Sequence, residues 1–201
     1  VWGDPKESVT WAEVDDALKT RWQHPLGGKI GLDAVAVDSG DGETMDSVLA
    51  FCHPRFARRV IAIKGDGGNR PAIVASKSKG SKLFIVGVDT ILSQILTAVS
   101  RGRSWRFSHT LETEWFEQFT CKRRILRYSK GVPVRTFEQI MGRRAEAIDC
   151  VTYALAARQL VKLDLDRRSN ELRGMTTAPP PTCAIPRAKP PPRATRGRRT
   201  S

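Results

Sequence analysis

Four short apolar runs in the first half of the chain predict β-strands. Each is partly β-branched and is closed by glycine, serine or an acidic residue, which is typical of a buried strand beside a turn. Two later segments, 122–128 and 132–139, flank a short turn and are expected to pair with each other. The first four runs lie in LDAVAVD (32–38), RRVIAIKG (58–65), PAIVAS (71–76) and LFIVGVD (83–89).

Other segments repeat apolar residues every three or four positions, which predicts helices. The first, TWAEVDDALKTRW, opens with Thr10 and Glu13 at the spacing of a capping box, and residues 1–9 are expected to be irregular. The second follows the first strand and should end at Pro54, because the residue before a proline disfavours helix. Further helices are expected at 90–100, 111–119 and 144–161.

The chain is strongly basic: 34 Lys and Arg outnumber 21 Asp and Glu over 201 residues, a formal net charge of +13. This excess favours polyanionic partners, nucleic acid first and an anionic membrane surface second. No apolar run approaches the roughly 18 residues of a membrane span, and no secretory signal is visible. Because the cysteines and histidines show no metal-ligand spacing, we expect a reduced, cytoplasmic protein without structural zinc.

Composition divides the chain into three parts. Residues 1–24 form a helical lead-in, residues 25–164 hold the predicted sheet, and the Pro- and Arg-rich residues 165–201 are expected to be a disordered tail. The tail either keeps the protein soluble or attaches it electrostatically to DNA or to a partner. The folded part is basic as well, and its candidate DNA-binding residues are Lys77, Lys79, Lys82, Arg123 and Arg124.

Two of the predicted strands end in an aspartate. Asp38 closes the first and Asp89 the fourth, and adjacent strand ends in an α/β sheet deliver side chains to one edge, where ligands usually bind. Glu146 and Asp149 lie three positions apart on the last long helix and share one of its faces. If that helix packs across the sheet, the four carboxylates converge.

Carboxylates packed so closely would repel one another, and Mg²⁺ or Mn²⁺ would relieve the repulsion. Two such ions can clamp the attacking water and the leaving oxygen of a phosphodiester, which is hydrolytic chemistry on a polyanion. Each acid also has a structural alternative. Asp38 could be a turn residue, Asp89 or Thr90 a helix cap, Asp149 a partner of Arg144 or Lys122, and Glu146 a solvent-facing residue.

Other kinds of site find less support. The glycine-rich stretches GDGGN and SGDGE lack the lysine-serine ending of a phosphate-binding loop, and Ser39 has no G-x-S-x-G elbow around it. The sequence shows no nucleotide pocket for a small-molecule phosphotransferase. The aromatic residues of 105–119 are expected mainly to fill the core rather than to stack on bases.

Five segments in register resemble the nuclease domain of phage large terminase subunits of the lambda GpA type, over roughly residues 25–160. The resemblance implies an α/β, RNase H-like fold, with a mixed central sheet flanked by helices, and metal-dependent cutting of viral DNA during packaging. The segments are AVDSGDGET, RRVIAIKGDGGNRP, KLFIVGVDTILSQI, EWFEQFT and RRAEAIDCVTYALAA.

By position, Asp38 matches the first-strand acid of this family, Asp89 the acid of GVDT, and Asp149 the helix acid, with Glu146 beside it. Lys64 matches a recurrent lysine expected near the scissile phosphate. The resemblance implies two Mg²⁺ or Mn²⁺ ions and double-stranded DNA as substrate. It also implies the host cytoplasm as the location, and a terminase ATPase domain, a small terminase subunit and the portal as partners.

The chain departs from the family at Leu92, where a lysine is usual, at Ala145, where an asparagine is common, and after Thr120, where an acid is usual. We therefore expect either a weak two-metal endonuclease or a catalytically degenerate module that binds DNA or helps packaging assembly. The family's ATPase motor does not precede the domain here. We expect a separated domain of a longer protein or the remnant of a decaying prophage gene.

Overall fold

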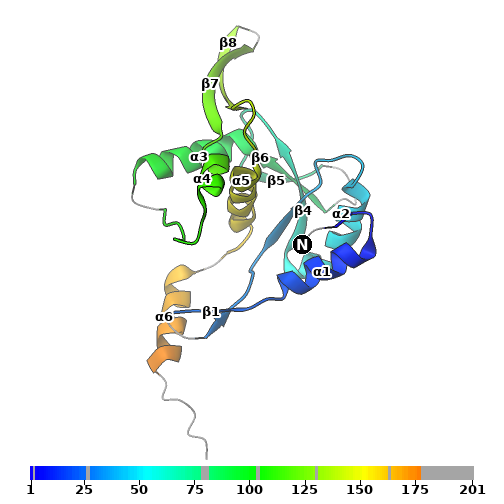
Figure 1. Cartoon of the computed structure of the whole chain (residues 1–201), viewed down its shortest axis with the longest axis vertical. Helices are drawn as coiled ribbons and strands as arrows, with labels where there is room; N and C mark the ends of the chain where they lie inside the picture. The colour runs from blue at the N-terminus through cyan, green and yellow to red at the C-terminus, as the bar shows by residue number, and fades with distance from the viewer. Residues whose placement is uncertain are drawn as a thin grey trace, which may run out of the picture.

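The computed structural model describes residues 1–177 except 2, 26–27, 78–81, 103–104, 130 and 163. Its centre is a four-stranded sheet of order β3-β4-β6-β5, in which the first three strands are parallel and β5 runs antiparallel to β6 (Figure 1). The strands are β3 (Val35–Asp38), β4 (Val60–Asp66), β5 (Ile73–Ala75) and β6 (Leu83–Gly87). All four predicted strands are confirmed, and the sheet is mixed.

Side chains of β4 alternate between two hydrophobic clusters, one on each face of the sheet. Ile61 and Ile63 are buried against α3 (Val88–Ser100) and α5 (Glu146–Gln159). Val60 and Ala62 are buried on the other face, among side chains of α1 (Ser8–Leu18) and α2 (Met45–Cys52). This alternation is the consequence of strand geometry. Helices therefore cover both faces, and the α/β prediction is confirmed.

The predicted helices are all present, with shifted ends. α1 begins at Ser8, so residues 8 and 9 are helical, and the expected capping box at Thr10 is wrong: Thr10 is a buried residue inside the helix. α2 passes directly into η1 (His53–Arg58), a 3₁₀-helix with Pro54 in its first turn, as the proline predicted. β6 ends at Gly87, so Asp89 lies in the first turn of α3 rather than on the strand.

A long hairpin projects from the body at the top of Figure 1. It consists of β7 (Lys122–Ser129) and β8 (Val132–Gln139), which pair antiparallel as predicted. Near its base lies α4 (Thr113–Phe119), whose aromatic side chains pack with Trp105 and Phe107. These aromatic residues adjoin the main core, as expected.

A two-stranded ribbon and a helix were not predicted. β1 (Trp22–Gln23) and β2 (Lys29–Ile30) form a small antiparallel ribbon. α6 (Leu165–Thr177) is a helix at the start of the segment expected to be a tail, and residues 178–201 lie outside the described part. None of the described helices is long and apolar enough to span a membrane.

Candidate functional site

Three of the four predicted carboxylates line one open cavity between β3 and α5. Asp38 comes from the end of β3, and Glu146 and Asp149 come from the first turn of α5. The volume is about 960 Å³, and much of the remaining wall is apolar, including Ala36 and Ala154. We call it the carboxylate cavity.

Hydrogen bonds to the neighbouring strand fix the chain directly after Asp38. The backbone N–H and the hydroxyl of Ser39 both donate to the carbonyl oxygen of Ile63, at 2.8 and 2.7 Å. The N–H of Gly40 donates to Oδ1 of Asp38 at 2.9 Å. The Asp38 side chain is thereby held at the carboxyl edge of the sheet and is also part of the turn that follows β3.

Tyr153 is a cavity residue that the sequence analysis missed. Its hydroxyl donates a hydrogen bond to Asp38, and its pKa is raised by burial first and then by the negative charges of Asp38 and Asp149. A Cβ on Gly65 of β4 would lie 2.8 Å from the Tyr153 hydroxyl oxygen, so this glycine leaves the room that the ring needs. Tyr153 follows Asp149 by four positions on a helix, a spacing that places both on one face and could have identified it.

The two acids of α5 each have a basic partner. The ammonium group of Lys122 forms an ion pair with Asp149, which is one of the alternatives raised by the sequence. Arg144 contacts Glu146 at 3.2 Å, and the Glu146 side chain is 57% exposed. The pKa of Glu146 is lowered, chiefly by a hydrogen bond from its own backbone N–H, against an opposing effect of burial; Arg144 lowers it further.

Asp89 lies outside the carboxylate cavity, in the wall of a second hollow of about 750 Å³ beside the hairpin. It is buried, and its Oδ2 accepts hydrogen bonds from the N–H of Gly68 at 2.7 Å and from the hydroxyl of Thr136 at 3.0 Å. Because β4 separates β3 from β6, Asp38 and Asp89 follow strands about 10 Å apart. The expected convergence therefore brings together Asp38, Glu146 and Asp149 but not Asp89.

Lys64 is exposed on β4, and strand alternation places it on the same sheet face as Val60 and Ala62. Asp38 instead faces α5, on the other side of the sheet. Among the candidate DNA-binding residues, Lys79 lies outside the described part and Lys77 is exposed. Lys82 lies over the Phe56 ring, Arg124 lies over the Phe137 ring, and Arg123 pairs with Glu138.

The donor set of the carboxylate cavity suits a hard divalent cation, because carboxylate oxygens are the ligands that Mg²⁺ and Mn²⁺ prefer. Within the described residues, however, no three His, Cys, Asp or Glu side chains form a group able to hold a metal ion. The cavity thus offers carboxylates of the right chemistry, two of which are neutralised by Lys122 and Arg144.

A family model and a known relative indicate the same family for this chain. The family model described as terminase large subunit gpA, endonuclease domain, matches residues 1–170. The large terminase subunit of Enterobacteria phage P21 is 28% identical over 176 residues, an alignment that covers 78% of this chain and 27% of that protein. No solved structure matches. The chain belongs to the family of terminase large subunit gpA endonuclease domains.

Proposed function

We propose that this chain is the nuclease domain of a phage DNA-packaging terminase and that it hydrolyses phosphodiester bonds of double-stranded DNA with Mg²⁺ or Mn²⁺. Family membership supports the reaction class. The observation that carries the site is that Asp38 and Asp149, far apart in the sequence, line one cavity and both act electrostatically on Tyr153. An RNase H-like fold is part of the proposal, supported by the first-strand acid and the parallel order of β3, β4 and β6.

Asp38 and Asp149 would hold the ion, with Glu146 available in the same cavity. A second ion at Asp89 would lie in the separate hollow beside the hairpin. Bound divalent ions activate water for attack and neutralise charge on the phosphate. Tyr153 positions Asp38 by donating a hydrogen bond to it. Because the pKa of the Tyr153 hydroxyl is raised, that hydroxyl stays protonated and remains a donor through the neutral range. Lys122 supplies the positive charge beside Asp149 when no ion does.

Basic residues away from the acids would hold the DNA. The hairpin strands carry five described lysine and arginine residues against Glu138 as their only described acid. A two-stranded ribbon fits the major groove of B-form DNA. Lys64, Lys77, Lys79 and Lys82 would add phosphate contacts. In the packaging machine, we expect the partners to be an ATPase domain, a small terminase subunit and the portal, in the host cytoplasm.

Plasmid nicking tests the reaction. The parent protein is incubated with supercoiled plasmid and Mn²⁺ or Mg²⁺ beside Asp38→Asn and Asp149→Asn, with EDTA as the metal-free arm. We expect slow nicking by the parent, loss in both variants, and loss in EDTA. Asp46→Asn, a matched change on the exposed side of α2, should cut like the parent.

The competing function is a DNA-binding or assembly module without catalysis. The pairing of Asp149 with Lys122 is the observation that favours it, because the ion pair satisfies the carboxylate without a metal. That function predicts DNA retention with steep salt dependence and no nicking with any divalent ion. Equal nicking by parent and Asp38→Asn would instead refute the assigned site.

A further inference from the structure

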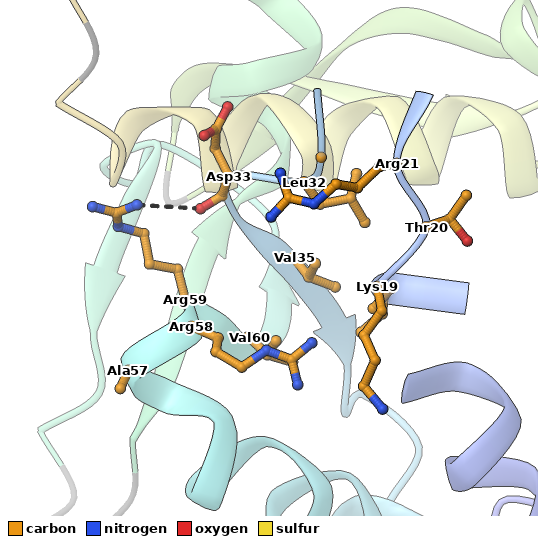
Figure 2. A pocket seen from close by; sticks show the side chains of 12 residues that line it. Lys19, Thr20, Arg21, Leu32, Asp33, Val35, Ala57, Arg58, Arg59 and Val60 are labelled. Carbon is orange, nitrogen blue, oxygen red and sulfur yellow. Dashed lines mark hydrogen bonds between the residues drawn. The ribbon is translucent and has the colours of Figure 1, made fainter. Parts of the chain in front are cut away.

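A third cavity, of about 510 Å³, opens where β3 and β4 begin, at the end of the sheet opposite Asp38 (Figure 2). Four basic residues line it, together with one acid, Asp33, and apolar side chains that include Val35 and Val60. In Figure 2, Arg21 lies on one side of Val35 and Arg58 on the other. We call it the arginine cavity, and its basic residues are Lys19, Arg21, Arg58 and Arg59.

Much of this positive charge is not neutralised by the protein. Asp15 accepts hydrogen bonds from Arg55, Lys19 and Arg58, and these cations keep the pKa of Asp15 well below its usual range. Lys19 is paired with Asp16 as well, at 2.9 Å, so in the described part of the chain the charge left without a carboxylate partner is that of Arg21 and Arg59. Arg21 has no hydrogen-bond or ion-pair partner among the residues described. The guanidinium of Arg59 reaches only the backbone carbonyl of Asp33, at 3.5 Å (dashed in Figure 2).

Arg59 is held in an unfavourable backbone conformation. Its φ of 57° and ψ of 33° are left-handed, and no other described non-glycine residue has a positive φ. The conformation is fixed because the N–H of Arg59 donates to Phe56 and its carbonyl accepts from the N–H of Val35, both at 2.9 Å. Glycine would adopt this geometry with less strain. An arginine where glycine is favoured motivates the hypothesis that the side chain has a use.

The arginine cavity adjoins the carboxylate cavity across strand β3. Leu32, Asp33 and Val35 line both. Asp38 follows Asp33 by five positions, and five residues of chain span at most about 18 Å. That length is close to the axial length of about five base pairs of B-form DNA, in which successive phosphates of a strand rise by about 3.4 Å. Five base pairs are about half a helical turn, so the phosphates that a duplex lying along β3 presents to the two cavities would come from opposite strands.

We propose that the arginine cavity binds a backbone phosphate of the DNA that the carboxylate cavity cuts, and that Arg21 and Arg59 are the contacting residues. The inference rests on the proposed function for the identity of the polyanion. It adds a DNA anchor at the opposite end of β3 from the acids.

Salt-dependent DNA binding by the full chain tests the anchor. Affinity for a fluorescent 20-base-pair duplex is measured by anisotropy in EDTA, over a series of KCl concentrations, for the parent, Arg21→Gln and Arg59→Gly. Each variant should bind more weakly, and its slope of log affinity against log salt should be shallower by about 1 for the lost phosphate contact. The charge-matched control is Arg106→Gln, an exposed arginine outside the cavity. It should keep the parental slope.

Arg59→Gly also separates binding from folding. Because glycine relieves the left-handed strain, its melting temperature should equal or exceed the parental value while DNA affinity falls. Parental slopes in Arg21→Gln and Arg59→Gly would overturn the proposal. The proposal would also be overturned if pyrophosphate stabilised the parent but not the variants while duplex binding by the variants was unchanged. The cavity would then bind free phosphate rather than DNA.

The binding readout is independent of cleavage. If Asp38→Asn nicks plasmid like the parent, the carboxylate assignment fails, yet a shallower slope in the arginine variants still supports the anchor. If Asp38→Asn is inactive and the slopes are unchanged, the proposed function stands and the anchor fails.

Discussion

The ammonium group of Lys122, at the start of β7, is hydrogen-bonded to the carboxylate of Asp149 in the first turn of α5. The Lys122 side chain is only 15% exposed, so this positive charge is held in place by packing as well as by the pair. A divalent ion bound to Asp149 would compete with Lys122 for the same oxygens. The ion pair should therefore determine the concentration of divalent ion at which the proposed site is occupied.

Replacing Lys122 tests this competition. In Lys122→Gln, Asp149 loses its cationic partner, and we expect Mn²⁺ to stabilise the variant at concentrations several-fold lower than the parent requires. Without metal, the variant should be less stable by about 2 kcal/mol, the usual contribution of a hydrogen bond to a charged group. Thermal shift over an Mn²⁺ titration measures both. Arg123→Gln, one residue along and paired with Glu138, is the control and should titrate like the parent. A higher Mn²⁺ requirement in Lys122→Gln would contradict the prediction.

Tyr153→Phe removes the hydrogen bond to Asp38 and keeps the ring. We expect the fold to persist with a loss of about 1 kcal/mol. Nicking should fall roughly tenfold, because Asp38 loses one of the two groups that orient it. Circular dichroism and plasmid nicking, measured on one preparation, separate these effects. Unchanged nicking would show that the hydroxyl serves only the fold.

The same variant gives a pH test. The pKa of Tyr153 is raised in the folded protein, so the unfolded chain loses its phenolic proton first, at about pH 10. The contribution of this group to stability is complete below pH 10 and declines above it, by up to about 1.4 kcal/mol for each pH unit. The free energy of unfolding should therefore fall less steeply in Tyr153→Phe than in the parent above pH 10. Parallel curves from urea denaturation would contradict the assignment.

Gly65→Ala should disturb the same site from the sheet. The new methyl group would lie 2.8 Å from the Tyr153 oxygen and 3.1 Å from Val88 Cγ2, and overpacking of this kind costs about 1–3 kcal/mol. Combining it with Tyr153→Phe should recover part of the loss, because the closest atom is removed. Gly42→Ala meets nothing within 4 Å and is the matched control. Additive losses in the double variant would argue against this contact.

Two substitutions of Asp89 distinguish a structural carboxylate from a metal ligand. In Asp89→Asn, an amide oxygen can still accept from Gly68 and Thr136, so stability should change little. Asp89→Ala leaves both donors without their acceptor and should cost about 2–3 kcal/mol. If Asp89 holds a second ion, both variants lose nicking. Parental nicking by a stable Asp89→Asn would confine the site to the carboxylate cavity.

Local sequence patterns predicted the helices and strands well, whereas contacts between distant segments were harder to predict. The run ending in Asp38 has strand periodicity and a glycine turn, so its place in the sheet was predictable. Asp89 follows an equally good run, but the helix begins at Val88 and turns the carboxylate toward Gly68 and Thr136. Lys122 was named only as one alternative partner of Asp149, because a pattern does not show how a hairpin base packs on a helix.

The arginine cavity had no local signature. It is assembled from the end of α1, the segment before β3 and the junction of η1 with β4. The left-handed geometry of Arg59 depends on its bonds to Phe56 and Val35, which no propensity for arginine predicts. α6 was missed for a different reason: its sequence has little to bury, so only its charged pairs, such as Arg167 with Glu171, distinguish it from coil.

The projecting hairpin touches two separate hollows through its two strands. Lys122 of β7 is bonded to Asp149, and Thr136 of β8 is bonded to Asp89. The strands are joined along eight residue pairs, from Lys122 with Gln139 to Ser129 with Val132, and so move as one ribbon. Any force that tilts the outer end of this arm is transmitted to both acids at once, which makes their positions mechanically dependent on each other.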